Sequence, residues 1–151
     1  MILPAGAAAP DFTLVNQFGQ PVRNADFLGR QVTVVFFPLA FSGVCQSELS
    51  ALRDNLGMFE ELGVELLAVS VDSKHTLRAW SEREGYEFSL LADFWPHGAV
   101  ASAFGAFDDS AGVARRATFV IDADGRVAAS FATDRGEARS LDQYRNALAT
   151  L

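Results

Sequence analysis

Two long apolar segments separated by an amphipathic segment constrain the fold more than any other feature of this sequence. Residues 31–37 (QVTVVFF) and 64–71 (VELLAVSV) are apolar almost throughout and rich in β-branched side chains, which is typical of strands covered on both faces of a sheet. Between them, leucine and phenylalanine recur at spacings of three and four, which predicts one helix that Gly63 ends. Strand, helix and strand in this order predict a βαβ unit with a right-handed crossover. The apolar face of the helix consists of Leu49, Leu52, Leu56, Phe59 and Leu62.

The remaining segments extend this unit into an α/β layer fold. The 151 residues contain no linker, repeat or shift in composition, so we expect a single domain over residues 1–151. A β-hairpin and a helix that follow the βαβ unit predict a mixed sheet between helices. The further elements that we expect are a hairpin of residues 12–15 and 21–23, a helix from Asp72 or Ser73 to Gly85, a strand at 88–92, a short helix at 96–103, a hairpin of 117–121 and 126–131, and a last helix after a capping box of Ser140 and Gln143.

Charge and composition exclude several classes of protein. The net charge of −7 argues against binding to nucleic acid or to anionic membranes, both of which need clustered Lys and Arg. No apolar stretch reaches the length of about 20 residues that a membrane span needs. One cysteine rules out an internal disulfide, and His75 and His97 match no metal-ligand spacing. We therefore expect no metal, no other cofactor, and a cytoplasmic location in which the thiol stays reduced.

Cys45 is the strongest candidate for chemistry. It lies between the strand at 31–37 and the start of the helical stripe at Leu49, so that Ser42 can be the helix N-cap and Cys45 belongs to the first turn. The free N–H groups and the positive end of the helix dipole at this place favour the thiolate, which is the nucleophilic form. The alternative is a buried cysteine that acts only as a small apolar side chain. Loops at the carboxyl ends of strands hold ligands in α/β sheets, which favours the catalytic interpretation.

The sequence around Cys45 resembles the active-site motif of peroxiredoxins. In residues 38–45 (PLAFSGVC), proline, serine and cysteine have the spacing of the family motif Pro-x-x-x-Thr/Ser-x-x-Cys, and Glu48 follows as in many members. Residues 93–98 (DFWPHG) are similar to the AhpE-type one-cysteine members (alkyl hydroperoxide reductase E). Further matches lie in family order at residues 9–14 (APDFTL), 70–73 (SVDS), 116–122 (RATFVID) and 139–140 (RS).

This resemblance implies a thioredoxin-like fold with an N-terminal β-hairpin extension. It also implies a thiol-dependent peroxidase that reduces hydrogen peroxide, organic hydroperoxides or peroxynitrite. Cys45 would attack the peroxide and become a sulfenic acid. Arg116 would stabilise the thiolate and hold the peroxide. Ser42 would bond a peroxide oxygen in place of the commoner threonine, and Pro38 would shield the thiolate from water.

Two further residues match supporting positions of the family. Glu48 would orient Arg116, and Arg139 would be a second supporting cation. The residues alone leave structural alternatives open. Pro38 can simply end a strand, the two arginines can be solvated surface residues, and Glu48 can be an exposed residue near the helix N-terminus.

The lone cysteine departs from the two-cysteine pattern of the family. Cys45 has no resolving partner in the chain, so its sulfenic acid needs an external thiol. This partner would be a low-molecular-weight thiol or a thioredoxin-, glutaredoxin- or mycoredoxin-like protein. The family and the abundance of aromatic residues also lead us to expect a homodimer.

Two other functions remain as alternatives. The first is a redox-sensing thiol protein of the same fold with negligible turnover, because a fold does not fix a function. The second is a thiol–disulfide oxidoreductase, which is disfavoured because Glu48 stands where a Cys-x-x-Cys motif has its second cysteine.

Overall fold

The computed structural model describes all 151 residues and is built on a mixed seven-stranded sheet, which confirms the expected α/β class. The strand order is β2-β1-β5-β4-β3-β8-β9. Strands β3, β4 and β5 are parallel, and every other neighbouring pair is antiparallel. The strands of this sheet are β1 (Thr13–Asn16), β2 (Pro21–Arg23), β3 (Gln31–Phe36), β4 (Val64–Ser70), β5 (Ser89–Ala92), β8 (Arg116–Ile121) and β9 (Val127–Thr133).

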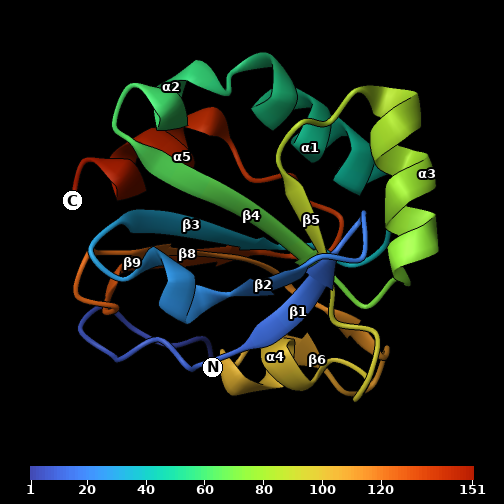
Figure 1. Ribbon diagram of the computed structural model, residues 1–151, viewed down its shortest axis with the longest axis horizontal. Helices are drawn as coiled ribbons and strands as arrows, with labels where there is room; N and C mark the ends of the chain where they lie inside the picture. Colours follow the sequence, from blue (N-terminus) through green and yellow to red (C-terminus); the bar gives the residue numbers. More distant parts are fainter.

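The central strand β3 is buried on both faces, as its apolar sequence predicts. Val35 contributes to one apolar core, whereas Val34 and Phe36 contribute to the other. This alternation follows from the two-residue period of a strand. Helices α1, α2, α3 and α5 cover the first face, and α4 lies with β6 on the opposite side (Figure 1). The helices are α1 (Gly43–Asp54), α2 (Gly57–Glu60), α3 (Lys74–Glu84), α4 (Ala99–Ala103) and α5 (Leu141–Leu148), and a 3-10 turn spans Asn24–Phe27.

The prediction of a single helix over the first apolar stripe is wrong, because the helical conformation is interrupted between α1 and α2. The side-chain amide of Asn55 donates to the carbonyl oxygen of Ala51, and the main-chain N–H of Asn55 bonds Leu52 in a tightened turn. The turn after α2 then leaves Leu62 exposed, although its spacing placed it on the apolar face. Both pieces still pack on the same core through Leu52 and Phe59.

Caps fix the ends of the later helices. The hydroxyl of Ser73 accepts the N–H of Thr76, so Ser73 and not Asp72 caps α3, and Gly85 ends this helix in the left-handed conformation at φ 70°. Ser140 and Gln143 form the expected capping box of α5.

Three other elements differ from the sequence-based expectation. The short helix expected from residue 96 begins only at Ala99. The expected N-terminal hairpin is present, but β1 also pairs with β5 and joins the main sheet. A small hairpin of β6 (Phe107–Asp108) and β7 (Val113–Ala114) was not foreseen, because two-residue strands carry no periodicity. None of the helices combines the length and the apolar character that crossing a bilayer requires.

Candidate active site

Cys45 lies in the first turn of α1, after the loop that follows the carboxyl end of β3. Ser42 precedes the helix in an extended conformation (φ −79°, ψ 147°), which makes it the N-cap position. The side chain of Cys45 is 0% exposed. Its sulfur is therefore shielded from bulk solvent and lies at the end of the helix where unpaired N–H groups present positive charge.

Arg116, the first residue of β8, contacts the sulfur directly. Its Nη1 atom lies 3.1 Å from Sγ of Cys45 and donates to Oε1 of Glu48 at 2.6 Å. Its Nε atom donates to the main-chain oxygen of Arg135 at 2.5 Å. Because β8 pairs with β3, a residue 71 positions away in the chain reaches the sulfur of Cys45.

Glu48 is the centre of a buried ionic cluster with Arg116 and Arg139. Arg139 donates to Oε2 of Glu48 through its main-chain N–H at 2.7 Å and through Nε at 2.8 Å, and to Oε1 through Nη2 at 3.0 Å. The side chains of all three residues are at most 3% exposed. The alternative in which these groups are solvated surface residues is therefore wrong.

The charges of this cluster do not cancel. Two guanidinium groups face one carboxylate, which leaves one buried positive charge beside the sulfur of Cys45. A buried charge is costly unless an opposite charge compensates it. The sulfur of Cys45 lies against this charge, through its contact with Nη1 of Arg116.

The lowered pKa of Glu48 shows that its attraction to Arg139 and Arg116 outweighs the effect of burial. Burial alone would raise the pKa of Glu48. The hydrogen bonds and the charge of Arg139, together with the charge of Arg116, overcome this effect and hold the pKa below its ordinary value. Glu48 is therefore ionised at neutral pH.

The loop between β3 and α1 is fixed at several points. Pro38 is buried and has no N–H to present to the sulfur. The hydroxyl of Ser42 donates to the carbonyl oxygen of Leu39 at 2.7 Å and makes no hydrogen bond to the helix N-terminus. Phe41 adopts the left-handed conformation at φ 66°, and its ring lies 6.0 Å from that of Trp80. A non-glycine residue in this conformation indicates that the surroundings impose the shape of the loop.

Asp72 holds the same loop from the end of β4, a contact that the sequence did not reveal. Its Oδ2 atom accepts the main-chain N–H of Ala40 at 2.8 Å and the hydroxyl of Ser70 at 2.7 Å. From the sequence, Asp72 is only one of two candidate caps of the following helix. A parallel order of β3 and β4 is the one signal that could have placed Asp72 beside this loop.

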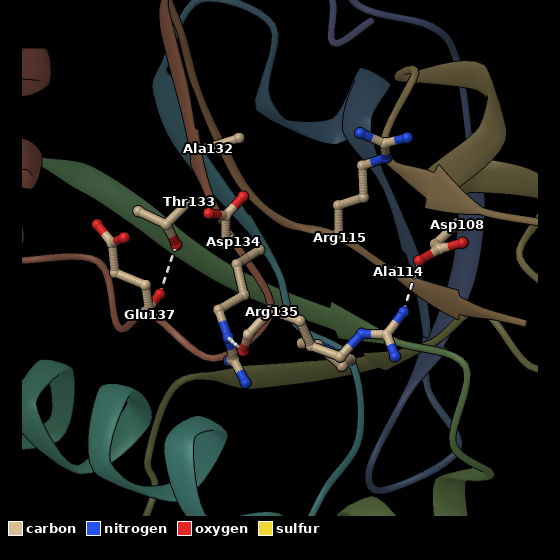
Figure 2. A pocket seen from close by; sticks show the side chains of 10 residues that line it. Asp108, Ala114, Arg115, Ala132, Thr133, Asp134, Arg135 and Glu137 are labelled. Atoms are coloured by element: carbon tan, nitrogen blue, oxygen red, sulfur yellow. Dashed lines mark hydrogen bonds and ion pairs between the residues drawn. The ribbon is translucent and has the colours of Figure 1, made fainter. Parts of the chain in front are cut away.

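A cavity of about 560 Å³ opens beside the cluster, with Pro38 and Arg116 among its lining residues. Figure 2 shows its charged side chains, with Arg115 on one side and Arg135 running across to Asp108. Arg116 both lines this cavity and contacts Sγ of Cys45, whereas Cys45 itself does not line the cavity. The two histidines lie outside this group, and no cluster in the structure has the acidic, histidine and cysteine groups for a metal ion.

Comparisons with known proteins agree on one family. The family model described as "AhpC/TSA family" matches residues 5–130. Alkyl hydroperoxide reductase E of Mycobacterium tuberculosis (strain ATCC 25618 / H37Rv) is 46% identical over 151 residues, which is 99% of each chain. Peroxiredoxin Bcp of Escherichia coli (strain K12) is 34% identical over 131 residues, which is 83% of each chain. The crystal structure of Enterococcus faecalis AhpC has a TM-score of 0.89 at 30% identity, covering 99% of this chain and 93% of that one.

The buried cluster predicts how stability depends on pH. Because the pKa of Glu48 is lowered in the folded chain, its ionisation stabilises the fold above the unfolded pKa of about 4.3 and this contribution is lost as pH falls through the folded pKa. In Glu48→Gln, we expect the free energy of unfolding at neutral pH to fall by about 3–5 kcal/mol, because two buried guanidinium groups lose their anion. Urea denaturation across the acidic range should also show a flatter pH dependence for this variant than for the wild type.

Glu65 provides the matched control, since its partner Arg30 holds it in an exposed ion pair. Glu65→Gln should keep the wild-type pH dependence and lose less stability than Glu48→Gln. Equal pH dependence in all three proteins would show that Glu48 does not carry this effect.

Proposed function

We propose, from the premise that this chain belongs to the AhpC/TSA family and is a thiol-dependent peroxidase, that Cys45 is the thiol that reduces the peroxide. The contact that supports this proposal is the 3.1 Å approach of Arg116 to Sγ within a cluster that has one unbalanced positive charge. The proposed substrates are hydrogen peroxide, organic hydroperoxides and peroxynitrite.

In the proposed reaction, the Cys45 thiolate attacks one oxygen of the hydroperoxide. The S–O bond forms as the O–O bond breaks, so that Cys45 is oxidised to a sulfenic acid and the peroxide is reduced. The departing oxygen leaves as an alkoxide or hydroxide and takes up a proton from solvent. Negative charge therefore moves from the sulfur to the departing oxygen, and hydrogen-bond donors along this path stabilise the transition state.

Arg116 supplies such donors. Its Nη1 and Nε atoms already donate hydrogen bonds to protein atoms. Its Nη2 atom has no protein partner and is not fully buried. Because Arg116 lines the cavity, Nη2 is free to bond a peroxide oxygen there. One guanidinium thus contacts the sulfur and the incoming oxygen together.

The remaining site residues have supporting roles in this proposal. Ser42 lies at the loop beside Cys45, where its hydroxyl can exchange the Leu39 oxygen for a peroxide oxygen. Pro38 keeps water from the thiolate. Glu48 orients Arg116 by accepting from Nη1, and Arg139 keeps Glu48 in place and ionised.

An external thiol completes the proposed cycle. The thiol attacks the sulfenic sulfur, which releases water and forms a mixed disulfide with Cys45. A second thiol then attacks this disulfide, releases reduced Cys45 and leaves a disulfide of the two reductant thiols. Since Cys45 is fully buried, the mixed disulfide requires the start of α1 to move. This dependence on a thiol supply supports a reducing compartment such as the cytoplasm.

Mass spectrometry of the intact chain tests the proposed nucleophile. We expect one equivalent of peroxide to add one oxygen atom to the wild type, and a reduced thiol added afterwards to remove it. Cys45→Ser should consume no peroxide and gain no oxygen while it keeps the wild-type circular dichroism spectrum. Undiminished peroxide consumption in this variant would exclude Cys45 as the nucleophile, and a rate no faster than that of free cysteine would favour a redox sensor over a peroxidase.

Arg116 can be tested by its effect on the peroxide step alone. Arg116→Ala should lower the second-order rate constant for peroxide by about 10²–10³-fold, because donors to the transition state are lost. Stopped-flow mixing of reduced protein with peroxide measures this constant without any reductant. Arg145→Ala removes an exposed arginine on α5 and should keep the wild-type rate. Equal rates in the two variants would remove Arg116 from the proposed mechanism.

We also propose a homodimer. Phe41 follows β3, and Phe94 and Trp95 follow β5; all three side chains are exposed. Because β3 and β5 are parallel, these residues lie at the same end of the sheet, where the strands finish. These strands are two positions apart, which corresponds to about 10 Å. Trp95 is 80% exposed. Clustered exposed aromatic side chains are typical of protein interfaces, and a second copy of the chain is the proposed partner.

Sedimentation equilibrium tests this assembly. The wild type should have twice the mass of the chain, and Trp95→Asp should shift it toward the monomer because a charge would be buried in the interface. Phe18→Asp changes another exposed aromatic side chain, which lies in the turn between β1 and β2, and should leave the mass unchanged. A monomeric wild type would rule out the proposed dimer.

A further inference from the structure

One exposed ion pair is connected to Arg116 through a single main-chain oxygen. Nη2 of Arg135 lies 2.5 Å from Oδ2 of Asp108, and the main-chain oxygen of Arg135 accepts from Nε of Arg116 at 2.5 Å. Figure 2 shows Arg135 reaching from the turn after β9 across the cavity to Asp108 on β6. The same residue thus bonds a surface carboxylate with its side chain and the buried guanidinium with its backbone.

The carboxylate of Asp108 is held in place before it meets Arg135. Its Oδ1 atom accepts the N–H and the hydroxyl of Ser110, at 3.1 and 2.7 Å, and the N–H of Ala111 at 3.3 Å. The Ser110 hydroxyl and these main-chain donors, with Arg135, also lower the pKa of Asp108, so it stays charged at neutral pH. Oδ2 is the oxygen that remains to accept from Arg135. Because the bonds to Oδ1 hold the carboxylate on the turn between β6 and β7, Arg135 meets an acceptor whose position is fixed.

The turn that carries Arg135 has few other attachments. It is closed by the N–H of Glu137, which donates to the oxygen of Asp134, and by the hydroxyl of Thr133, which donates to the oxygen of Glu137. Both bonds lie within the turn or join it to β9. Apart from the bond that its main-chain oxygen accepts from Nε of Arg116, the polar contact that ties this turn to the opposite wall of the cavity is the Arg135 side chain.

We propose that Asp108 and Arg135 are positioning residues for the peroxide step. Their ion pair fixes the main-chain oxygen of Arg135, this oxygen fixes Nε of Arg116, and Nη1 of Arg116 is thereby held against the sulfur of Cys45. This inference rests on the proposed function of Cys45 and Arg116. Neither Asp108 nor Arg135 touches the reacting atoms.

A purely electrostatic role of the two charges makes a different prediction. Asp108 is negative and Arg135 is positive, so through space they affect the Cys45 thiolate in opposite directions. Removal of Asp108 would then speed the peroxide reaction, and removal of Arg135 would slow it. If the pair positions Arg116, both removals slow the reaction, because either one breaks the same contact.

The experiment is a double-mutant cycle of Asp108→Asn, Arg135→Gln and the double variant. Asparagine keeps an oxygen that accepts from Ser110 and Ala111, so the β6–β7 turn is retained. With hydrogen peroxide, which is uncharged, we expect each single variant to react about two- to fivefold more slowly than the wild type, a size that an exposed ion pair can account for. The double variant should be no slower than the singles, since the interaction is lost only once.

Ionic strength gives an independent readout that a merely structural role would not change. The wild-type rate should fall as salt rises toward about 1 M, where charges are screened beyond about 3 Å, and the three variants should have lost this dependence. The midpoint of the pH profile of the reaction should also move in the same direction in both single variants.

The matched control is the Arg30–Glu65 pair at the other end of the sheet. Its side chains are 57% and 38% exposed, compared with 57% and 28% for Arg135 and Asp108. Arg30→Gln and Glu65→Gln should keep the wild-type rate and its salt dependence.

Two results would overturn the positioning role. One is opposite changes in rate for Asp108→Asn and Arg135→Gln, and the other is wild-type rates in both single variants. A wild type that does not react with peroxide would instead reject the proposed function, so the two failures are distinguishable.

Discussion

The geometry around Cys45 depends on an unequal number of buried positive and negative charges. Arg116 and Arg139 share the single carboxylate of Glu48, and the sulfur of Cys45 lies against the guanidinium that is less fully compensated. Glu48 keeps both cations in fixed positions but cannot neutralise them. In the proposed mechanism, the Cys45 thiolate is the anion that balances this cluster, so the group proposed to react is also the group that compensates the charge. In the same proposal, oxidation of Cys45 to an uncharged sulfenic acid removes this balance and so links the chemistry to the local stability of the first turn of α1.

The sheet brings these groups together from distant parts of the chain. β3 leads into the helix with Cys45 and Glu48, β8 carries Arg116 to the sulfur because it pairs with β3, and the segment before α5 delivers Arg139. A contact from outside this group also fixes the position of the loop before α1. Asp72 at the end of β4 holds the loop before α1. A hydrophobic core on both faces of the sheet keeps all of these attachments in register.

Much of this architecture could be predicted from local patterns. The apolar runs of β3 and β4, the βα position of Cys45 and the capping box at Ser140 each depend on neighbours in the sequence, so the chain itself reveals them. The break at Asn55 was missed because a side-chain hydrogen bond overrode the apolar period. The distances from Arg116 to Cys45 and Glu48 come from strand pairing across the sheet, and Asp108 has no sequence signal for what it contacts. The family motif indicated which site residues to consider, whereas their burial and mutual geometry required the fold.

The shared carboxylate also restricts how this chain can diverge from its relatives. Replacing either arginine or Glu48 alone leaves a charge in the interior with fewer partners than before, so each single step is costly even where the final combination would be acceptable. Surface pairs such as Arg30 and Glu65 impose no such linkage, since water solvates whichever partner remains. Single substitutions are therefore less costly at the rim of the cavity than in the interior of the site.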